Sequence, residues 1–181
     1  MYARLLSPPV GKKSYFLFGP RGTGKTSFIR EKYRDANYLD LLDEELFLRL
    51  NAEPHRLQSY ILKPGKPVII DEVQRIPAIL NEIHRLIEEK RLTFILTGSS
   101  ARKLRKAGVN LLAGRALSFE MFPLTSFEAA DDFKLEEALK WGMLPGRFSE
   151  ADPAKFLYAY VVTYLKEEVQ QERLTDRKSV V

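Results

Sequence analysis

Residues 19–26 constrain this chain more than any other segment, because they read Gly-Pro-Arg-Gly-Thr-Gly-Lys-Thr, a glycine, four residues and then Gly-Lys-Thr. The glycines permit backbone angles that other residues reach only with strain, and they let the backbone approach a bound group closely. Successive N–H groups then face one concavity, and the helix that follows adds its positive N-terminal end. The segment therefore predicts a phosphate-binding loop.

The flanking residues supply the context that such a loop needs. Residues 14–18 form a short apolar and aromatic run typical of a strand, and residues 27–33 have apolar positions at helical spacing. Within the loop, Lys25 can reach β- and γ-phosphates and the Thr26 hydroxyl can hold Mg²⁺. A glycine-rich turn that only joins a strand to a helix would leave the Lys-Thr pair unexplained. The candidate phosphate-binding residues are Gly19, Pro20, Arg21, Gly22, Thr23, Gly24, Lys25, Thr26 and Ser27.

Composition limits the classes of protein that the chain can belong to. The 181 residues suit one domain with a small extension, and 45% hydrophobic and 29% charged residues are ordinary for a globular protein. There is no cysteine, which excludes disulfides and cysteine metal sites and suits a cytoplasmic location. No run reaches the roughly 18 apolar residues of a membrane span, so no membrane partner is expected.

Strand-type and helix-type segments alternate through the first two thirds of the chain. This alternation predicts an α/β fold of three layers, a parallel five-stranded sheet with helices on both faces, followed by a C-terminal helical extension. Residues 68–70 and 92–97 have the continuous apolar character of central strands, whereas residues 116–121 alternate and fit a strand nearer an edge. The predicted strands are residues 14–18, 36–42, 68–70, 92–97 and 116–121.

Three polar segments follow directly on predicted strands. They are the phosphate loop, the pair Asp71-Glu72, and residues 97–99. Ligands of open parallel sheets bind outside the carboxyl ends of the strands. We therefore expect these three segments to lie on one rim of the sheet.

Asp71 and Glu72 have the residue types of a site that hydrolyses a nucleoside triphosphate. A carboxylate at the end of a buried strand can hold Mg²⁺ opposite Thr26. The adjacent Glu72 can polarise a water for attack on the γ-phosphate, an effect typically worth about 10²–10⁴-fold in rate. A surface acidic pair that closes a strand is the alternative, and the loop earlier in the chain favours the functional interpretation.

Other candidate residues have two interpretations each. Thr97 and Ser99 can contact the γ-phosphate or the attacking water, or a serine there can simply cap the next helix. Arg115 can reach the nucleotide of a neighbouring subunit, or it can be an ordinary surface arginine. The stretch from residue 90 to 119 has seven basic residues and no acidic one, which suits contact with nucleic acid or a solvated face near a nucleotide.

The order of these motifs resembles the predicted AAA+-superfamily P-loop ATPases of bacteria and archaea, in which the ATPase domain precedes a C-terminal domain of unknown function. The residues that carry the resemblance are those of the loop, Ile69-Ile70-Asp71-Glu72-Val73-Gln74-Arg75, Thr97-Gly98-Ser99-Ser100 and Leu112-Ala113-Gly114-Arg115. The resemblance covers most of residues 1–130.

The resemblance implies ATP binding and hydrolysis with Mg²⁺, with ATP and ADP as ligands. It assigns Lys25 and Thr26 to the phosphates and Mg²⁺, Asp71 to Mg²⁺, and Glu72 to water activation. It gives Ser99 or Ser100 a sensing role and Arg115 an arginine-finger role in a homo-oligomer. Residues 1–128 are then the ATPase core, and residues 129–181 are a helical extension that begins a truncated C-terminal domain. A nucleic-acid or protein client would bind through that C-terminal region.

Two other functions remain open at this point. Asp71-Glu72-Val73-Gln74 is similar to a helicase box, so a DNA-stimulated motor is one alternative, although one domain is too few for a two-lobed helicase and no aromatic stacking platform accompanies the basic residues. A nucleotide-gated interaction module with negligible turnover is the other.

Overall fold

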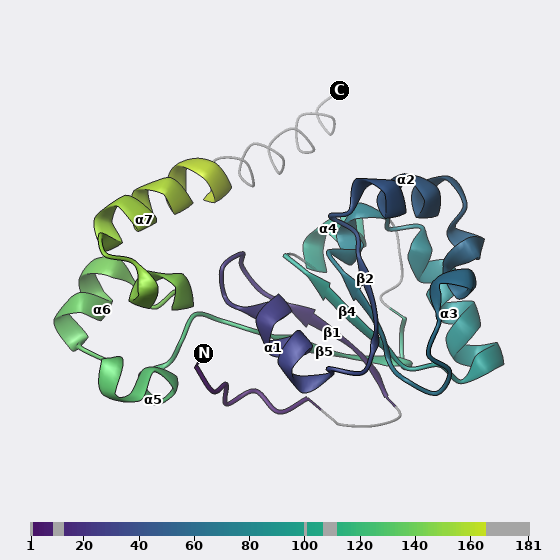
Figure 1. Ribbon diagram of the computed structural model, residues 1–181, viewed down its shortest axis with the longest axis horizontal. Coiled ribbons are helices and arrows are strands. Elements are labelled where there is room, and N and C mark those ends of the chain that lie inside the picture. The colour runs from purple at the N-terminus through teal and green to yellow at the C-terminus, as the bar shows by residue number, and fades with distance from the viewer. Residues whose placement is uncertain (1, 9–12, 100, 107–111, 166–181) are drawn as a thin grey trace. The chain divides into compact units, whose positions relative to one another are not determined.

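The computed structural model describes residues 2–8, 13–99, 101–106 and 112–165. Five parallel strands form one sheet in the order β2-β3-β4-β1-β5 (Figure 1). The predicted α/β fold with a parallel five-stranded sheet is therefore confirmed. The strands are β1 (Ser14–Phe18), β2 (Asn37–Asp40), β3 (Val68–Asp71), β4 (Phe94–Gly98) and β5 (Ala116–Glu120).

Helices cover both faces of the sheet because alternate strand residues point to opposite sides. On one face, Tyr15 and Leu17 of β1 pack with Ile29 of α1 (Lys25–Lys32). On the other face, Phe16 and Phe18 belong to a larger apolar cluster to which α2, α3 and α4 contribute (Figure 1). The helical elements on this face are α2 (Glu44–Ala52), η1 (Pro54–Tyr60), η2 (Val73–Arg75), α3 (Ile79–Lys90) and α4 (Ala101–Lys106).

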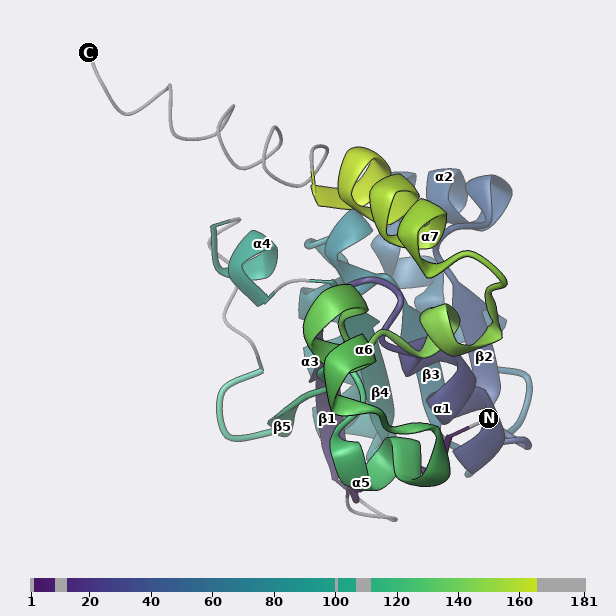
Figure 2. The same ribbon diagram turned by 90° about the vertical axis from the view of Figure 1, so that its left-hand side faces the viewer.

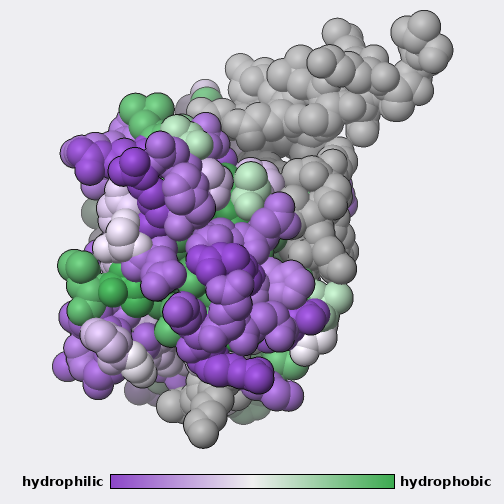
Figure 3. Space-filling view, turned by 90° about the vertical axis from the view of Figure 1, so that its right-hand side faces the viewer, coloured by the Kyte–Doolittle hydropathy of each residue, from purple (hydrophilic) through white to green (hydrophobic). Residues whose placement is uncertain are grey.

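Helix α3 shows how the sequence pattern separates core from solvent. Its residues Ile79, Ile83 and Leu86 are fully buried, whereas Asn81 and His84 are exposed. This spacing places one apolar stripe against the sheet. The side of the molecule that carries α3 accordingly presents a largely hydrophilic surface with small separate apolar areas (Figure 3).

Some predicted bounds differ from the structure for local reasons. The second strand was expected over residues 36–42, but β2 ends at Asp40 because its carboxylate accepts a hydrogen bond of 2.9 Å from the Leu42 N–H and turns the chain. The apolar residues Leu57, Tyr60 and Ile61 predict a helix over residues 54–62. The structure has a 3₁₀ helix there, Pro54–Tyr60, which ends with a hydrogen bond from the Ile61 N–H to the Gln58 carbonyl.

The chain divides into two compact units, which we call the core unit, Arg4–Phe122, and the C-terminal unit, Met1–Ala3 with Pro123–Val181. The C-terminal unit is helical in its described part (Figure 2). A capping box between Thr125 and Glu128 begins its first helix. Its elements are α5 (Ser126–Ala129), η3 (Ala130–Asp132), α6 (Leu135–Trp141), η4 (Pro145–Ser149), α7 (Pro153–Tyr160) and the π-helical turn η5 (Val161–Leu165).

The apolar stripe that begins at Phe156 predicts one long last helix, over residues 153–174. Helix α7 begins as predicted at Pro153 and passes into η5 after Tyr160, and residues 166–174 lie outside the described part of the chain. The proposed domain boundary after residue 128 stays a prediction. No helix within the described ranges combines the length and the apolar character needed to cross a membrane.

Candidate functional site

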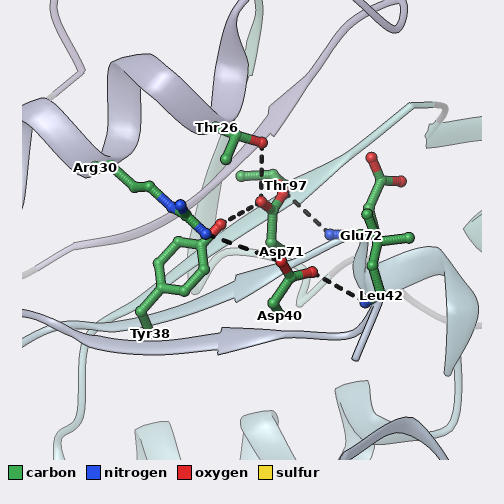
Figure 4. Close-up of polar contacts among 8 residues, drawn as sticks. All are labelled: Thr26, Arg30, Tyr38, Asp40, Leu42, Asp71, Glu72 and Thr97. Carbon is green, nitrogen blue, oxygen red and sulfur yellow. Dashed lines mark hydrogen bonds and ion pairs between the residues drawn. The ribbon is translucent and has the colours of Figure 1, made fainter. Parts of the chain in front are cut away.

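The carboxyl ends of β1, β3 and β4 bring the three polar segments together. Strand register pairs Phe18, which precedes the loop, with Gly98, and Ile70, which precedes Asp71, with Leu96. The phosphate loop, Asp71-Glu72 and Thr97 therefore lie on one rim of the sheet, as expected for ligand sites in this architecture. Figure 4 shows Thr26, Asp71 and Thr97 pointing toward one another.

Asp71 is the centre of the polar contacts on this rim. Thr26 Oγ1 donates a hydrogen bond of 2.9 Å to Asp71 Oδ2, and Thr97 Oγ1 donates a short one to Asp71 Oδ1 (Figure 4). Asp71 is only 3% exposed. A buried carboxylate is retained where several donors satisfy it, and hydroxyl groups from two other elements do so here.

Tyr38 is a third partner of Asp71, and its place in the predicted strand of residues 36–42 assigned it no role at the site. Its hydroxyl donates a short hydrogen bond to Asp71 Oδ2 from the neighbouring strand β2 (Figure 4). Burial raises the pKa of the Tyr38 hydroxyl and the Asp71 contact raises it further, so the tyrosine is protonated and acts as the donor. The guanidinium of Arg30, on α1, lies 4.5 Å from the centre of the Tyr38 ring.

Side chains of the phosphate loop donate hydrogen bonds to carbonyl groups of the same loop. Lys25 Nζ donates to the carbonyl oxygens of Gly19, at 2.6 Å, and Pro20, at 2.9 Å. Thr23 Oγ1 donates to the same Pro20 carbonyl at 2.8 Å. Lys25 is buried in the described structure, so its ammonium group lies inside the curve of the loop.

Gly19 and Gly24 adopt backbone angles that explain why glycine stands there. Gly24 has a φ of 90° at the N-cap of α1. Gly19 has a φ of 149°, and a Cβ at this position would overlap the carbonyl oxygen of Met121. The loop thus begins in close contact with the backbone that follows β5.

Glu72 has a strained backbone. Its φ of 58° and ψ of 45° lie in the left-handed region, which costs a non-glycine residue on the order of 1–3 kcal/mol. Its N–H donates to Thr97 Oγ1 at 3.2 Å, and its carboxylate accepts a short hydrogen bond from Gln74 Nε2. In Figure 4 the Glu72 carboxylate extends away from the Asp71 carboxylate, as a second acid with a separate role would.

Of the remaining candidate residues, Ser99 lies at the carboxyl end of β4 beside this rim, and Arg115 does not lie near it. Ser99 follows β4 and accepts a 3.4 Å contact from Gln74 Nε2, whereas Ser100 lies outside the described residues. Arg115 precedes β5, at the amino ends of the strands, where it forms an ion pair with Glu88 of α3. It is therefore separated from the loop of its own chain by the length of the strands, roughly 15 Å.

The donor set fits Mg²⁺ and a nucleotide phosphate. A threonine hydroxyl and a carboxylate are the hard oxygen ligands that Mg²⁺ takes, and this ion commonly keeps water and substrate phosphates as its other ligands. In the part of the chain that the structure describes, no group of three or more His, Cys, Asp or Glu could hold a metal by itself. The first N–H groups of α1, which have no partner within the helix, lie after the loop and suit an anion.

A parallel sheet with a Gly-x4-Gly-Lys-Thr loop after its interior strand β1, and a buried aspartate at the end of β3, defines a P-loop protein of the nucleotide-binding class. A family model described as an AAA domain matches residues 11–130. The chain therefore belongs to the AAA domain family of P-loop ATPases, and a C-terminal region follows the matched segment. A search of curated proteins returned no match.

Proposed function

We propose that this protein binds ATP at the loop of residues 19–26 and hydrolyses it to ADP with Mg²⁺. Lys25 holds the β- and γ-phosphates, and Thr26 and Asp71 hold Mg²⁺, which would neutralise phosphate charge when bound. Glu72 polarises the attacking water. Membership of the AAA domain family implies nucleotide binding and hydrolysis, and the residue roles are our proposal.

The observation that carries this proposal is the contact between Thr26 and Asp71. Their oxygens lie 2.9 Å apart although Thr26 lies in the first turn of α1 and Asp71 ends β3. A metal ion at this place would find two hard ligands already directed at one point. Preorganised ligands reduce the cost of binding because little reorganisation is needed.

Nucleotide binding is tested by titrating fluorescent ATP against the purified protein with and without Mg²⁺. Lys25→Ala is expected to weaken ATP binding at least tenfold, since it removes the ammonium group at the loop. Lys63→Ala is the matched control, because Lys63 is a surface lysine that pairs with Asp35 away from the loop. Equal affinities of Lys25→Ala and wild type would refute the site.

We also propose that the nucleotide state of the core is transmitted to the C-terminal region, residues 129–181, which is helical as far as the structure describes it, to residue 165. The support is the packing of Gly19 against the Met121 backbone, together with the 2.8 Å hydrogen bond from Met121 N–H to the Phe18 carbonyl. The chain leaves the core unit directly after these contacts, at Phe122. A phosphate that moves the loop would thereby move the segment leading to the C-terminal unit.

Hydrogen exchange tests this coupling. Addition of Mg²⁺ and ATP is expected to slow or accelerate exchange of the amides of residues 119–125 in wild type, and to leave them unchanged in Lys25→Ala. Residues 63–67, a turn remote from the loop in sequence, serve as the internal control. Unaltered exchange of residues 119–125 in nucleotide-saturated wild type would contradict the coupling.

For Arg115 we propose action on the nucleotide of a neighbouring subunit in a homo-oligomer. The support is its place at the strand end opposite to its own loop, which removes its own nucleotide from reach. Mixing Arg115→Ala with Lys25→Ala subunits tests this, because a mixed interface can unite an intact loop with an intact arginine. Recovery of turnover in the mixture is expected, and no recovery would refute action in trans.

A further inference from the structure

Gln74 lies between two residues of the proposed site without belonging to it. It stands in the 3₁₀ turn η2, and its Nε2 group donates a short hydrogen bond to Glu72 Oε2. The same Nε2 lies 3.4 Å from Ser99 Oγ, after β4. One amide group thus contacts both the acid that follows β3 and the serine that follows β4.

The side-chain amide of Gln74 packs against Gly98, and we call this position the seat of the amide. Its Oε1 atom is buried against Gly98, and a Cβ at position 98 would overlap this oxygen. Oε1 has no hydrogen-bond partner among the described residues. The orientation of the amide is fixed by chemistry, because an ionised carboxylate only accepts and the Nε2 group must therefore face Glu72.

The backbone of Glu72 is held separately from its carboxylate. Its N–H donates to Thr97 Oγ1 at 3.2 Å, and its left-handed φ and ψ are set in the turn from β3 to η2. Strained backbone at such a position persists only when the surroundings over-determine it. Thr97 thus contacts the backbone of Glu72, and Gln74 contacts its carboxylate.

We propose that Gln74 is a positioning residue for Glu72: it holds the Glu72 carboxylate in place through its Nε2 group, and Gly98 provides the seat for its amide. Gln74 acts through Glu72 and does not touch the nucleotide. The contact with Ser99 joins the carboxylate to the end of β4. This inference rests on the proposed function, in which Glu72 polarises the attacking water. Hydrogen bonds to an ionised carboxylate are the stronger ones, so one donor can restrain the side chain.

Gln74→Met tests the inference, because methionine has a similar length and lacks an N–H donor. The expected result is a fall in kcat on the order of tenfold, part of the 10²–10⁴-fold typical of a positioned general base. KM, ATP affinity and melting temperature are expected to stay close to those of wild type. A kcat equal to or above that of wild type would overturn the inference.

Gly98→Ala provides a second variant that leaves Gln74 and Glu72 in the chain. The added methyl group occupies the seat of the amide, so kcat is expected to fall as in Gln74→Met while ATP affinity is retained. Normal turnover in a folded Gly98→Ala protein would count against the seat and hence against the inference.

A double-mutant cycle distinguishes this inference from the proposed function. If Gln74 acts only through Glu72, Gln74→Met is expected to have little effect on single-turnover hydrolysis in a Glu72→Gln background. A fall by the same factor in both backgrounds would show independent action and overturn the inference. Wild-type turnover in Glu72→Gln alone would refute the role of Glu72 itself, whereas an inactive Glu72→Gln with a fully active Gln74→Met would refute the inference alone.

Discussion

The Thr26 hydroxyl donates a hydrogen bond of 2.9 Å to the carboxylate of Asp71, 45 residues further along the chain. This contact joins the first turn of the helix after the phosphate loop to the end of a central strand. Both residues are proposed Mg²⁺ ligands, so their relationship makes the metal dependence of ATP binding a direct readout of the site.

Thr26→Ala is expected to remove most of the Mg²⁺-dependent gain in ATP affinity, because the hydroxyl ligand is lost while the loop N–H groups remain. Thr26→Ser keeps the hydroxyl and is expected to retain this gain. The measurement is calorimetric titration of ATP with and without Mg²⁺ for each variant. An equal Mg²⁺ effect in Thr26→Ala and wild type would exclude Thr26 as a ligand.

Tyr38→Phe is expected to lower the free energy of unfolding of the nucleotide-free protein by about 1.5–3 kcal/mol, the range for a hydrogen bond to a charged group. The reason is the loss of the Tyr38 hydroxyl from buried Asp71. Urea unfolding measures the change, with Tyr158→Phe as the control because Tyr158 is 73% exposed. Equal stabilities of Tyr38→Phe and wild type would show that the contact contributes nothing.

Gly19→Ala is expected to destabilise the fold by about 3 kcal/mol, since the new methyl group overlaps the Met121 carbonyl and the backbone must shift. Gly65→Ala is the matched control. Gly65 also has a positive φ, of 75°, but a Cβ there meets nothing within 4 Å, so only the backbone cost of about 1 kcal/mol remains. Equal losses of stability in the two variants would show that the loop does not approach the Met121 carbonyl closely.

Glu88 gives a prediction for acid pH. The hydrogen bond from Arg115 lowers the pKa of the Glu88 carboxyl below its ordinary value of 4.5. A depressed pKa in the folded state stabilises the protein above the unfolded-state pKa, and this contribution is lost as the pH falls through the folded-state value. In NMR titrations, Arg115→Ala is expected to raise the pKa of Glu88 toward 4.5.

Arg91 serves as the comparison for that titration, because its effect on the pKa of Glu88 is the weakest of those acting on it. Arg91→Ala is therefore expected to raise the pKa by less than Arg115→Ala does. The reverse order would show that the Arg115–Glu88 ion pair is not the main cause.

The rim of the sheet could be predicted because the relevant side chains follow strands directly in the sequence. Asp71 is the last residue and Thr97 the last but one of strands whose apolar character marks them as central, and parallel strands have their carboxyl ends at one edge. Nothing but the order of residues along the chain was needed for this. The fold of the core followed from the same alternation of strands and helices.

Tyr38 and Gln74 could not be predicted in the same way. The contact of Tyr38 with Asp71 depends on β2 lying beside β3. A local sequence pattern predicts a strand but does not predict which strand lies beside it. The place of Gln74 depends on the left-handed backbone of Glu72 and on the room that Gly98 leaves. Such partners are set by tertiary packing, which the spacing of motifs does not report.

ATP hydrolysis is tested by measuring phosphate release by wild type and Glu72→Gln, together with the ATP affinity of both. We expect Mg²⁺-dependent phosphate release by wild type and a fall of at least about 10²-fold in Glu72→Gln, with ATP affinity retained. Tight ATP binding by wild type without phosphate release would contradict hydrolysis and favour a nucleotide-gated interaction module. Equal release by the two proteins would contradict the role of Glu72.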